Sequence, residues 1–277
     1  MHQVAITSGL TGFVGSNFLF NLHKKYNTVI NFERDNTHTA YYRNGKVEKL
    51  KKKEDIFELF NPVVFYNFAT CYNPNPKSIY DIKNIAESNI NFHLSVIESL
   101  KLNNIRVINF CSYLQLIKNE TQSPYTLSKE FLKVSLDCLS DNVSNIYLFD
   151  TFGNKDKRNK VVDAFISSIK MGKNIKIPEN EIIINISDVK DICESIEDVK
   201  RIPLGDSCVL SPHTIPLESL AELLMEIQGK KTKIIKSGTA KNNFKLIDNF
   251  PKNIYKQHHN NNLYEKLKKR TYEIIKA

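Results

Sequence analysis

The sequence predicts an α/β fold in which a parallel sheet is covered by helices on both faces. Three observations support this class. Short apolar segments alternate with longer amphipathic segments along the first half of the chain. A glycine-rich turn joins the first apolar segment to the first amphipathic one. The chain has 277 residues, 41% of them hydrophobic and 25% charged, so it can bury a substantial core.

The apolar segments are interpreted as strands and the amphipathic segments as helices. Strands are expected at residues 3–7, 28–32, 63–69, 106–110, 144–148 and 208–210. Helices are expected at residues 13–24, 78–103 and 124–139, with a weaker one at 54–60. Because each helix crosses between strands, the strands should run parallel and ligands should bind beyond their carboxyl ends.

The turn Gly9-x-x-Gly12-x-x-Gly15 follows the first expected strand and opens the first expected helix. Glycine has no Cβ, so the backbone can bend sharply there and come close to a diphosphate. The phosphate charge then lies at the N-terminal end of a helix, where free N–H groups point outward. This strand–turn–helix context predicts a dinucleotide-binding site in a doubly wound, Rossmann-type sheet.

The pattern becomes looser after about Thr151. Helices are expected at residues 161–171, 189–199, 217–227 and 263–275, with a strand near 182–186. We therefore expect a dinucleotide-binding domain over residues 1–157 and a smaller, mainly substrate-binding α/β portion over residues 158–277. A strand near 207–211 should return to the larger sheet.

The pair Tyr125-x-x-x-Lys129 lies four residues apart on the expected helix at 124–139, so both side chains project from one face. A neighbouring ammonium stabilises phenolate and lowers the tyrosine pKa from its ordinary value of about 10. The pair alone is common in lysine-rich chains. Together with the glycine turn it indicates an oxidoreductase that uses a nicotinamide cofactor.

The formal charge of +9 is concentrated at one end of the chain. Residues 230–277 carry 13 Lys and Arg against 3 Asp and Glu, whereas the rest carries 26 basic and 27 acidic residues. No aromatic-interleaved recognition motif accompanies this segment, so we expect no nucleic-acid partner and interpret it as a solvated basic face. Contact with a substrate phosphate, another subunit or an acidic surface stays open.

No apolar run approaches membrane-spanning length, and the first strand begins within three residues of Met1. We therefore expect no membrane segment, no signal peptide and a cytoplasmic location. The cysteines are scattered and form no C-x-x-C pair, which predicts reduced thiols. His258-His259 is interpreted as part of a loop, and no metal site is expected.

Several segments resemble the extended short-chain dehydrogenase/reductase family, in particular its members that modify nucleotide sugars. Ser8 to Gly15 is similar to that family's T-G-x-x-G-x-x-G, with Ser8 in place of Thr. Further matches are Asn67-Phe68-Ala69, Asn89, Asp150-Thr151-Phe152-Gly153 (family N-x-Y-G) and Ile186-Ser187-Asp188-Val189 (family V-D-D-V). The resemblance implies a homodimer formed through the helix that carries Tyr125.

The resemblance also implies the residues of the site. Ser112 would polarise a ketone oxygen, Tyr125 would donate its proton to the developing alkoxide, and Lys129 would tune Tyr125 and bind the nicotinamide ribose. Besides Tyr125 and Lys129, cofactor contacts are expected at Gly9, Thr11, Gly12, Phe13, Val14, Gly15, Glu33, Arg34, Phe68, Ala69 and Asn89. Substrate contacts are expected at Thr70, Tyr113, Asp150, Thr151, Phe152 and Arg158. Cys111 is interpreted as a small buried residue.

The reaction is narrowed by the residues after Ser112. Dehydratases of the family place an acidic pair there, whereas this chain has Tyr113, Leu114 and Gln115. The short segment from Ser112 to Tyr125 resembles reductases of CDP-linked 4-keto-6-deoxyhexoses. We expect reduction of the C4 ketone of a nucleotide-linked 4-keto-6-deoxysugar. A 4-epimerase with tightly bound NAD and a non-catalytic dinucleotide-sensing regulator are the alternatives.

The cofactor type depends on two adjacent residues after the second strand. Glu33 lies where NAD-preferring relatives place an acid on the ribose 2′-hydroxyl, and Arg34 lies where NADP-preferring relatives place a cation on the 2′-phosphate. An arginine offers a phosphate a bidentate partner, and Arg43 could assist. We expect NADP(H), with NAD(H) as the alternative.

Overall fold

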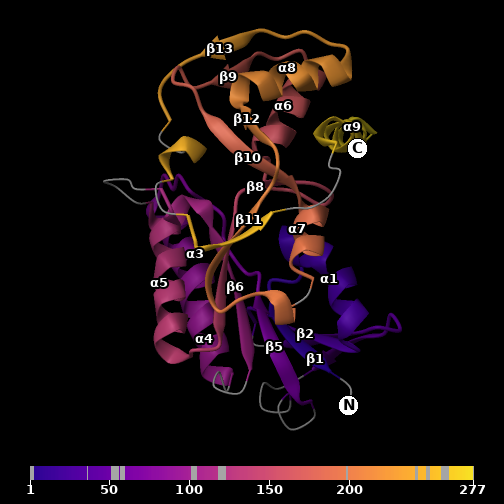
Figure 1. Cartoon of the computed structure of the whole chain (residues 1–277), viewed down its shortest axis with the longest axis vertical. Coiled ribbons are helices and arrows are strands. Elements are labelled where there is room, and N and C mark those ends of the chain that lie inside the picture. Colours follow the sequence, from indigo (N-terminus) through magenta and orange to yellow (C-terminus); the bar gives the residue numbers. More distant parts are fainter. Residues whose placement is uncertain are drawn as a thin grey trace.

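The computed structural model describes residues 3–276 except 36, 51–55, 57–59, 101–104, 118–122, 198, 241–242, 248–249 and 257–261. A nine-stranded sheet flanked by helices forms the larger part of the molecule, and a smaller part of short strands and helices lies at one end of it (Figure 1). The predicted α/β class with a mostly parallel, Rossmann-like sheet is confirmed.

The large sheet has the strand order β14-β11-β7-β6-β5-β1-β2-β3-β4. Its strands are β1 (Val4–Ser8), β2 (Thr28–Phe32), β3 (His38–Tyr42), β4 (Val47–Leu50), β5 (Pro62–Asn67), β6 (Arg106–Ser112), β7 (Val143–Leu148), β11 (Gly205–Leu210) and β14 (Asn253–Lys256). All neighbouring pairs from β14 to β2 are parallel, whereas β3 and β4 pair antiparallel. The sequence does not predict β3, β4 and β14, because they are short and β4 and β14 are largely polar.

Helices cover both faces of this sheet (Figure 1). One face carries α1 (Phe13–Lys25) and α7 (Val189–Ser195), and the other carries α3 (Ile79–Ala86), α4 (Phe92–Ser99) and α5 (Pro124–Leu139). The helix expected at 78–103 ends at Ser99 and contains a π-helical segment, Glu87–Asn91. The helix expected at 189–199 also ends early, at Ser195. The helix expected at 54–60 lies mostly outside the described residues.

The smaller part has its own hydrophobic core. It contains β8 (Asp150–Phe152), β10 (Ile183–Asp188) and β12 (Thr214–Pro216) in one sheet, β9 (Ile175–Ile177) and β13 (Ile234–Lys236) in another, and helices α6 (Val161–Lys170), α8 (Leu217–Gln228) and α9 (Leu263–Lys276). The chain returns from this part to the large sheet at β11. No helix in the described ranges is both long and apolar enough to cross a membrane.

The C-terminal segment is not only the solvated basic face that the sequence suggests. Arg270 of α9 is buried and forms an ion pair with Asp163 of α6, and Lys266 pairs with Asp191. The sequence pattern cannot show these partners, because each lies far away along the chain.

A row of buried polar side chains crosses the four central strands. Ser8 Oγ donates to Asn67 Oδ1 at 2.7 Å, Asn67 Nδ2 to Asn109 Oδ1 at 2.9 Å, and Asn109 Nδ2 to Asn145 Oδ1 at 2.9 Å. Each bond joins residues that are direct partners in the strand register. We call Ser8, Asn67, Asn109 and Asn145 the polar row. His93 of α4 adds its ring Nε2, 2.7 Å from Asn67 Oδ1, so the row also ties a helix to the sheet.

The buried ring of His93 should make folding stability depend on pH. Burial, and next the charge of Lys129, lower the pKa of His93 to about 3, while an unfolded histidine titrates near ~6.5. Below that pH only the unfolded state binds this proton, so stability is complete above pH ~6.5 and falls as the pH decreases toward 3. We expect His93 to account for a loss of about 2 kcal/mol between pH 7 and pH 5.

Urea unfolding of the wild type and of His93→Gln across this pH range measures the effect. Glutamine can still donate to Asn67 but cannot titrate, so the variant should lose stability less steeply. Equal slopes for the two proteins would contradict the assignment of a neutral His93.

Candidate functional site

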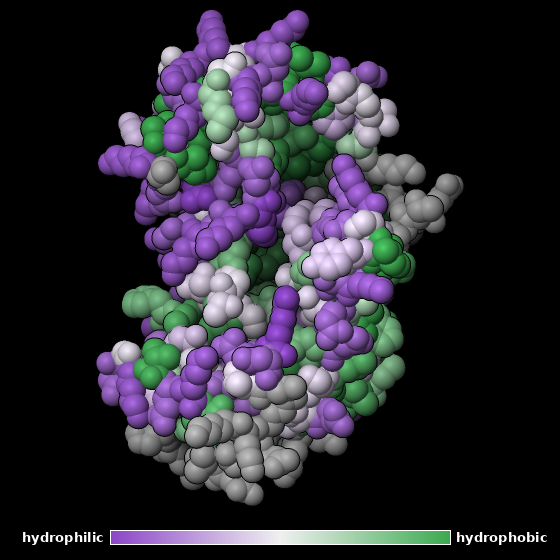
Figure 2. All heavy atoms as spheres, turned by 180° about the vertical axis from the view of Figure 1, so that it is seen from behind, coloured by the Kyte–Doolittle hydropathy of each residue, from purple (hydrophilic) through white to green (hydrophobic). Residues whose placement is uncertain are grey.

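A cleft of about 1070 Å³ lies where the glycine turn, the end of β6 and the start of α5 meet. The space-filling view from behind shows the molecule hollowed between its larger and smaller parts (Figure 2). Most residues predicted for the site line this cleft: Gly9, Thr11, Gly12, Phe13, Val14, Glu33, Arg34, Phe68, Ala69, Thr70, Ser112, Tyr113, Tyr125, Lys129, Thr151 and Arg158. Gly15, Asn89, Asp150 and Phe152 do not line it.

The glycine turn packs directly against the chain that follows β5. Gly9 has a φ of +74°, and a Cβ there would lie 2.5 Å from the Cα and N atoms of Ala69. A Cβ on Gly15 would lie 2.5 Å from the carbonyl oxygen of Gly9, so the backbone of Gly15 packs directly against that of Gly9. Only glycine fits both positions. The turn thus brings its backbone and the N-terminus of α1 next to the cleft, as a bound diphosphate requires.

The carboxylate of Glu33 is held in place at the end of β2. Its Oε1 accepts hydrogen bonds from Asn31 Nδ2 at 3.2 Å and from Thr39 Oγ1 at 3.0 Å. The amide oxygen of Asn31 in turn accepts from Leu10 N at 3.0 Å, which links Glu33 to the glycine turn. Arg34 is exposed at the same rim of the cleft. The fixed carboxylate can accept hydrogen bonds from a ribose diol and would repel a phosphate.

Ser112 and Tyr125 meet in the middle of the cleft. Ser112 is the last residue of β6, and its N–H donates to Gln115 Oε1 at 2.9 Å. The side chains of Ser112 and Thr70 lie close to the Tyr125 hydroxyl and favour its ionised form. Tyr125 lies in the first turn of α5, where the Ser123 Oγ accepts a hydrogen bond from Thr126 N at 3.2 Å. Two hydroxyls, one from the end of β6 and one from the first turn of α5, can therefore reach one carbonyl oxygen.

Asn89 holds the first turn of α5 and does not line the cleft, so its predicted contact with the cofactor stays a prediction. Its Nδ2 donates to Ser128 Oγ at 2.9 Å, and Ser128 Oγ donates to the carbonyl of Tyr125 at 2.7 Å. Its Oδ1 accepts from Cys71 N at 2.6 Å. Asn89 belongs to the π-helical segment, a distortion that often occurs at functional sites.

The electrostatics of Tyr125 differ from the sequence-based expectation that Lys129 lowers its pKa. Burial is the largest effect and raises the pKa of Tyr125 to about 12, against the lowering effects of Ser112, Thr70 and Arg158. The phenol is therefore protonated at neutral pH and can act as a proton donor. Burial also raises the pKa of the Cys111 thiol to about 12, which agrees with an unreactive buried cysteine.

The side chain of Lys129 is buried and lines the cleft. Burial lowers its pKa, and no hydrogen bond or ion pair holds its ammonium among the residues that the structure describes. A buried ammonium needs partners, and ribose hydroxyls would supply them. Together with the glycine turn, Lys129 makes the site fit a nicotinamide dinucleotide.

We call residues 153–160 the cationic loop, because four cations in it line the cleft: Lys155, Lys157, Arg158 and Lys160. The guanidinium of Arg158 lies 4.1 Å from the centre of the Phe13 ring, and the ammonium of Lys160 lies 4.4 Å from the centre of the Tyr72 ring. Burial, and next the charge of Arg158, lower the pKa of Lys160 to about 8. Such a concentration of positive charge suits a phosphate-bearing ligand.

The sequence analysis missed Lys160 and Tyr72, whereas Lys155 and Lys157 lie in the segment up to Arg158 that resembles the sugar-nucleotide loop of the reductases of CDP-linked sugars. The three lysines have a signal, because they surround Arg158 in a run of basic residues. Tyr72 has none, since it follows β5 in an irregular segment and reaches the loop only through tertiary packing.

Two residues predicted to bind substrate lie behind the cleft. Burial raises the pKa of the Asp150 carboxyl, against the lowering effects of Lys160, Tyr113 and Arg158. Phe152 is 1% exposed and packs in the hydrophobic core of the smaller part. Both positions fit a supporting role beneath the lining residues Tyr113 and Thr151.

Comparisons with known proteins agree with this site. Residues 5–194 match the profile of the NAD-dependent epimerase/dehydratase family. The CDP-abequose synthase of Yersinia pseudotuberculosis is 29% identical over 236 residues, which cover 80% of this chain and 82% of that protein.

Solved structures show the same fold at low identity. A UDP-glucuronic acid 4-epimerase from Bacillus cereus, in complex with UDP-glucuronic acid and NAD, has a TM-score of 0.74 at 14% identity, with 99% of each chain covered. A UDP-N-acetylglucosamine 4-epimerase from Methanobrevibacter ruminantium M1 has a TM-score of 0.71 at 19% identity, with 98% of each chain covered.

Substituting Gly9 tests the dinucleotide turn. In Gly9→Ala the new Cβ must displace the backbone of Ala69, so we expect dinucleotide binding to weaken by about tenfold or more. Gly172→Ala is the matched control, because Gly172 also has a positive φ, +64°, but no atom within 4 Å of its Cβ position. Calorimetric titration with NAD and NADP measures both variants, and equal binding in the two would contradict the assignment.

Proposed function

The chain belongs to the NAD-dependent epimerase/dehydratase family, and we propose that it reduces the C4 ketone of a nucleotide-linked 4-keto-6-deoxysugar. The observation that carries this proposal is the convergence of two hydroxyls, Ser112 and Tyr125, with the cationic loop in one cleft beside the dinucleotide turn. The relative that makes CDP-abequose, a deoxysugar nucleotide, supports the substrate class.

The chemistry follows from the positions of these residues. A reduced nicotinamide, when bound, supplies the hydride that C4 of the ketone accepts. Ser112 donates a hydrogen bond to the ketone oxygen and orients it. Tyr125, protonated at neutral pH, transfers its phenolic proton to that oxygen as negative charge develops there. Lys129 binds the ribose, and its positive charge stabilises the phenolate that remains.

The cationic loop is proposed to bind the substrate diphosphate. Arg158 is the central residue, because Asp156 and Thr151 hold its guanidinium while it lines the cleft. The ammonium of Lys160 lies 4.4 Å from the centre of the Tyr72 ring, and the charge of Asp150 partly opposes the lowering of the Lys160 pKa by burial. A diphosphate would neutralise several of these charges at once and so define one end of the substrate.

A second function, 4-epimerisation with a retained NAD, is supported by contacts across the dinucleotide turn. Asn17 Nδ2 donates to the carbonyl of Asn154 at 2.9 Å, and Arg158 stacks on Phe13. These contacts hold the loop against the N-terminus of α1, where it would slow the exchange of a bound cofactor.

One experiment separates the two reactions. Purified protein is supplied with CDP-, GDP- and dTDP-linked 4-keto-6-deoxysugars, with NADH or NADPH. A reductase oxidises one cofactor for each sugar reduced. A 4-epimerase instead inverts C4 of nucleotide sugars that carry a hydroxyl there, supplied in a parallel reaction, with no net change in nicotinamide absorbance, and it is purified with its cofactor bound.

We also propose a homodimer that pairs the apolar face of α3 and α5. Ile82, Leu127, Phe131 and Val134 are between 41% and 52% exposed there and line a shared groove. An exposed apolar face of this kind is typical of an interaction surface.

Both ligand types, nicotinamide and nucleotide sugar, are compatible with the cytoplasmic location expected from the sequence.

Removing the phenolic hydroxyl tests the mechanism. Tyr125→Phe should lower kcat by about 10²–10⁴-fold, because the alkoxide loses its proton donor. The dinucleotide should still bind, since the ring and Lys129 remain. Tyr80→Phe is the control, because Tyr80 is 69% exposed on α3. Near-normal turnover in Tyr125→Phe would overturn the proposed role.

For the cofactor we propose NAD(H), whereas the sequence led us to expect NADP(H) from Arg34 with Arg43 assisting. The support is the carboxylate of Glu33, held by Asn31 and Thr39. Glu33→Gln should raise KM for NADH by about tenfold, as expected for the loss of a charged hydrogen-bond acceptor. Arg34→Ala should leave it nearly unchanged. Steady-state rates with both cofactors measure this, and a selective loss of NADPH use in Arg34→Ala would support NADP(H) instead.

A further inference from the structure

We propose that Arg270, in the C-terminal helix α9, is a positioning residue for the cationic loop of residues 153–160. This inference rests on the proposed function, because that function places the loop against the substrate diphosphate. Arg270 does not line the cleft. It would act on substrate binding only through the loop.

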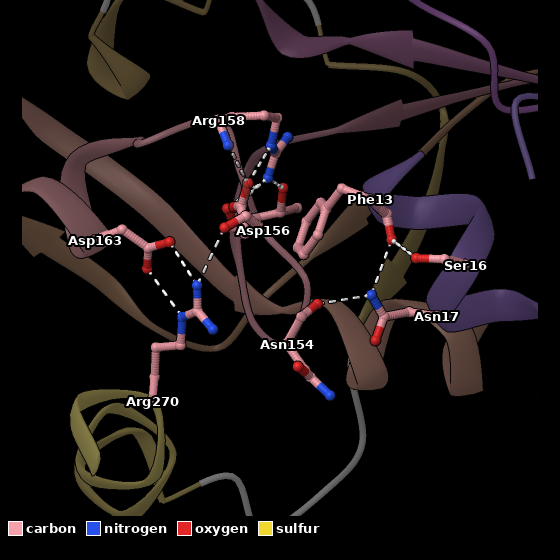
Figure 3. Close-up of polar contacts among 9 residues, drawn as sticks. Phe13, Ser16, Asn17, Asn154, Asp156, Arg158, Asp163 and Arg270 are labelled. Atoms are coloured by element: carbon pink, nitrogen blue, oxygen red, sulfur yellow. Dashed lines mark hydrogen bonds and ion pairs between the residues drawn. The ribbon is translucent and has the colours of Figure 1, made fainter. Parts of the chain in front are cut away.

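Outside α9, Arg270 contacts helix α6 and the cationic loop. Its Nε and Nη2 donate to the two carboxylate oxygens of Asp163 on α6, at 3.0 Å and 2.6 Å. Its Nη2 also donates to the main-chain carbonyl of Asp156 in the loop, at 3.3 Å. Figure 3 shows Arg270 reaching from α9 to both partners. The guanidinium therefore joins the C-terminal helix, α6 and the loop at one point.

Asp156 connects Arg270 to Arg158, which lines the cleft. Its carboxylate accepts from Arg158 Nε at 2.8 Å and from Arg158 Nη2 at 2.7 Å, while its carbonyl accepts from Arg270 (Figure 3). One residue is thus held by Arg270 through its main chain and holds Arg158 through its side chain. A shift of Asp156 would move Arg158 away from Phe13 and the cleft.

The loop needs such external contacts. Lys155 and Asn159 have positive φ values of 65° and 49°, a conformation that residues other than glycine rarely adopt. Surrounding contacts must hold a backbone of this kind. On the side of α1 the Asn17 to Asn154 hydrogen bond and the Phe13 ring contact the loop, and on the side of α9 Arg270 does.

Binding of nucleoside diphosphates tests the inference without depending on which reaction is catalysed. The full-length protein is titrated calorimetrically with CDP, UDP, GDP and dTDP, and the tightest is kept as the probe. Arg270→Ala should weaken its binding by about tenfold or more, because misplacing Arg158 removes its contact with the phosphates. Lys269→Ala removes a charge from an exposed neighbour on α9 and should leave binding nearly unchanged.

A double-mutant cycle distinguishes positioning from general destabilisation. If Arg270 acts through Arg158, adding Arg270→Ala to Arg158→Ala should weaken binding little further. Independent, multiplicative losses would overturn the inference. Hydrogen exchange gives a second readout: the amides of residues 153–160 should exchange faster in Arg270→Ala, and those of β1 should not.

If Arg270→Ala does not fold, a double variant that removes both charges of the buried ion pair replaces it. Arg270→Met with Asp163→Leu leaves no unpaired buried charge, yet it removes the hydrogen bond to Asp156. This variant should also bind the probe more weakly, and wild-type binding by it or by Arg270→Ala would overturn the inference. If none of the four nucleotides binds the wild-type protein, the proposed function fails first, and the inference fails with it.

Discussion

The polar row of Ser8, Asn67, Asn109 and Asn145 is the constraint on which the rest of the structure depends. Each amide in it uses a donor or an acceptor on a direct neighbour in the strand register. A strand that slipped by one residue would turn its amide to the other face and leave buried partners unpaired, at a cost of about 1–3 kcal/mol each. Apolar strands alone would tolerate such slips more easily, so the row selects one register.

That register determines where the strands end, and the site is built on those ends. Asn67 is followed by the segment that packs against Gly9, and Asn109 lies shortly before Ser112 on the same strand. The row also reaches the helices, since Asn145 Nδ2 donates to Asp137 of α5 at 2.9 Å. The glycine turn, the serine and the helix with Tyr125 and Lys129 are therefore placed by one continuous set of hydrogen bonds.

The opposite wall of the cleft depends on charge. Four cations gather in the cationic loop, and Asp156 and the buried Asp150 partly offset their charge. Their mutual repulsion and partial burial favour a ligand that brings negative charge into the cleft. The site thus combines one half held by the sheet, with Ser112, Tyr125 and Lys129, and a loop held by side chains from α1 and α9. This division fits a family in which similar chemistry is applied to different nucleotide sugars.

The sequence by itself determined the α/β class, the six main strands, the glycine turn and α5, because these depend on local periodicity and on glycine geometry. It also identified Ser112, Tyr125 and Lys129 by resemblance, and the structure brings all three to one cleft. Only the tertiary structure decided what surrounds the individual side chains. Burial, not Lys129, dominates the pKa of Tyr125. Phe152 belongs to a hydrophobic core, and Arg270 is buried in an ion pair. These properties depend on distant partners, such as Asp163, which lies 107 residues from Arg270, and no local pattern encodes them.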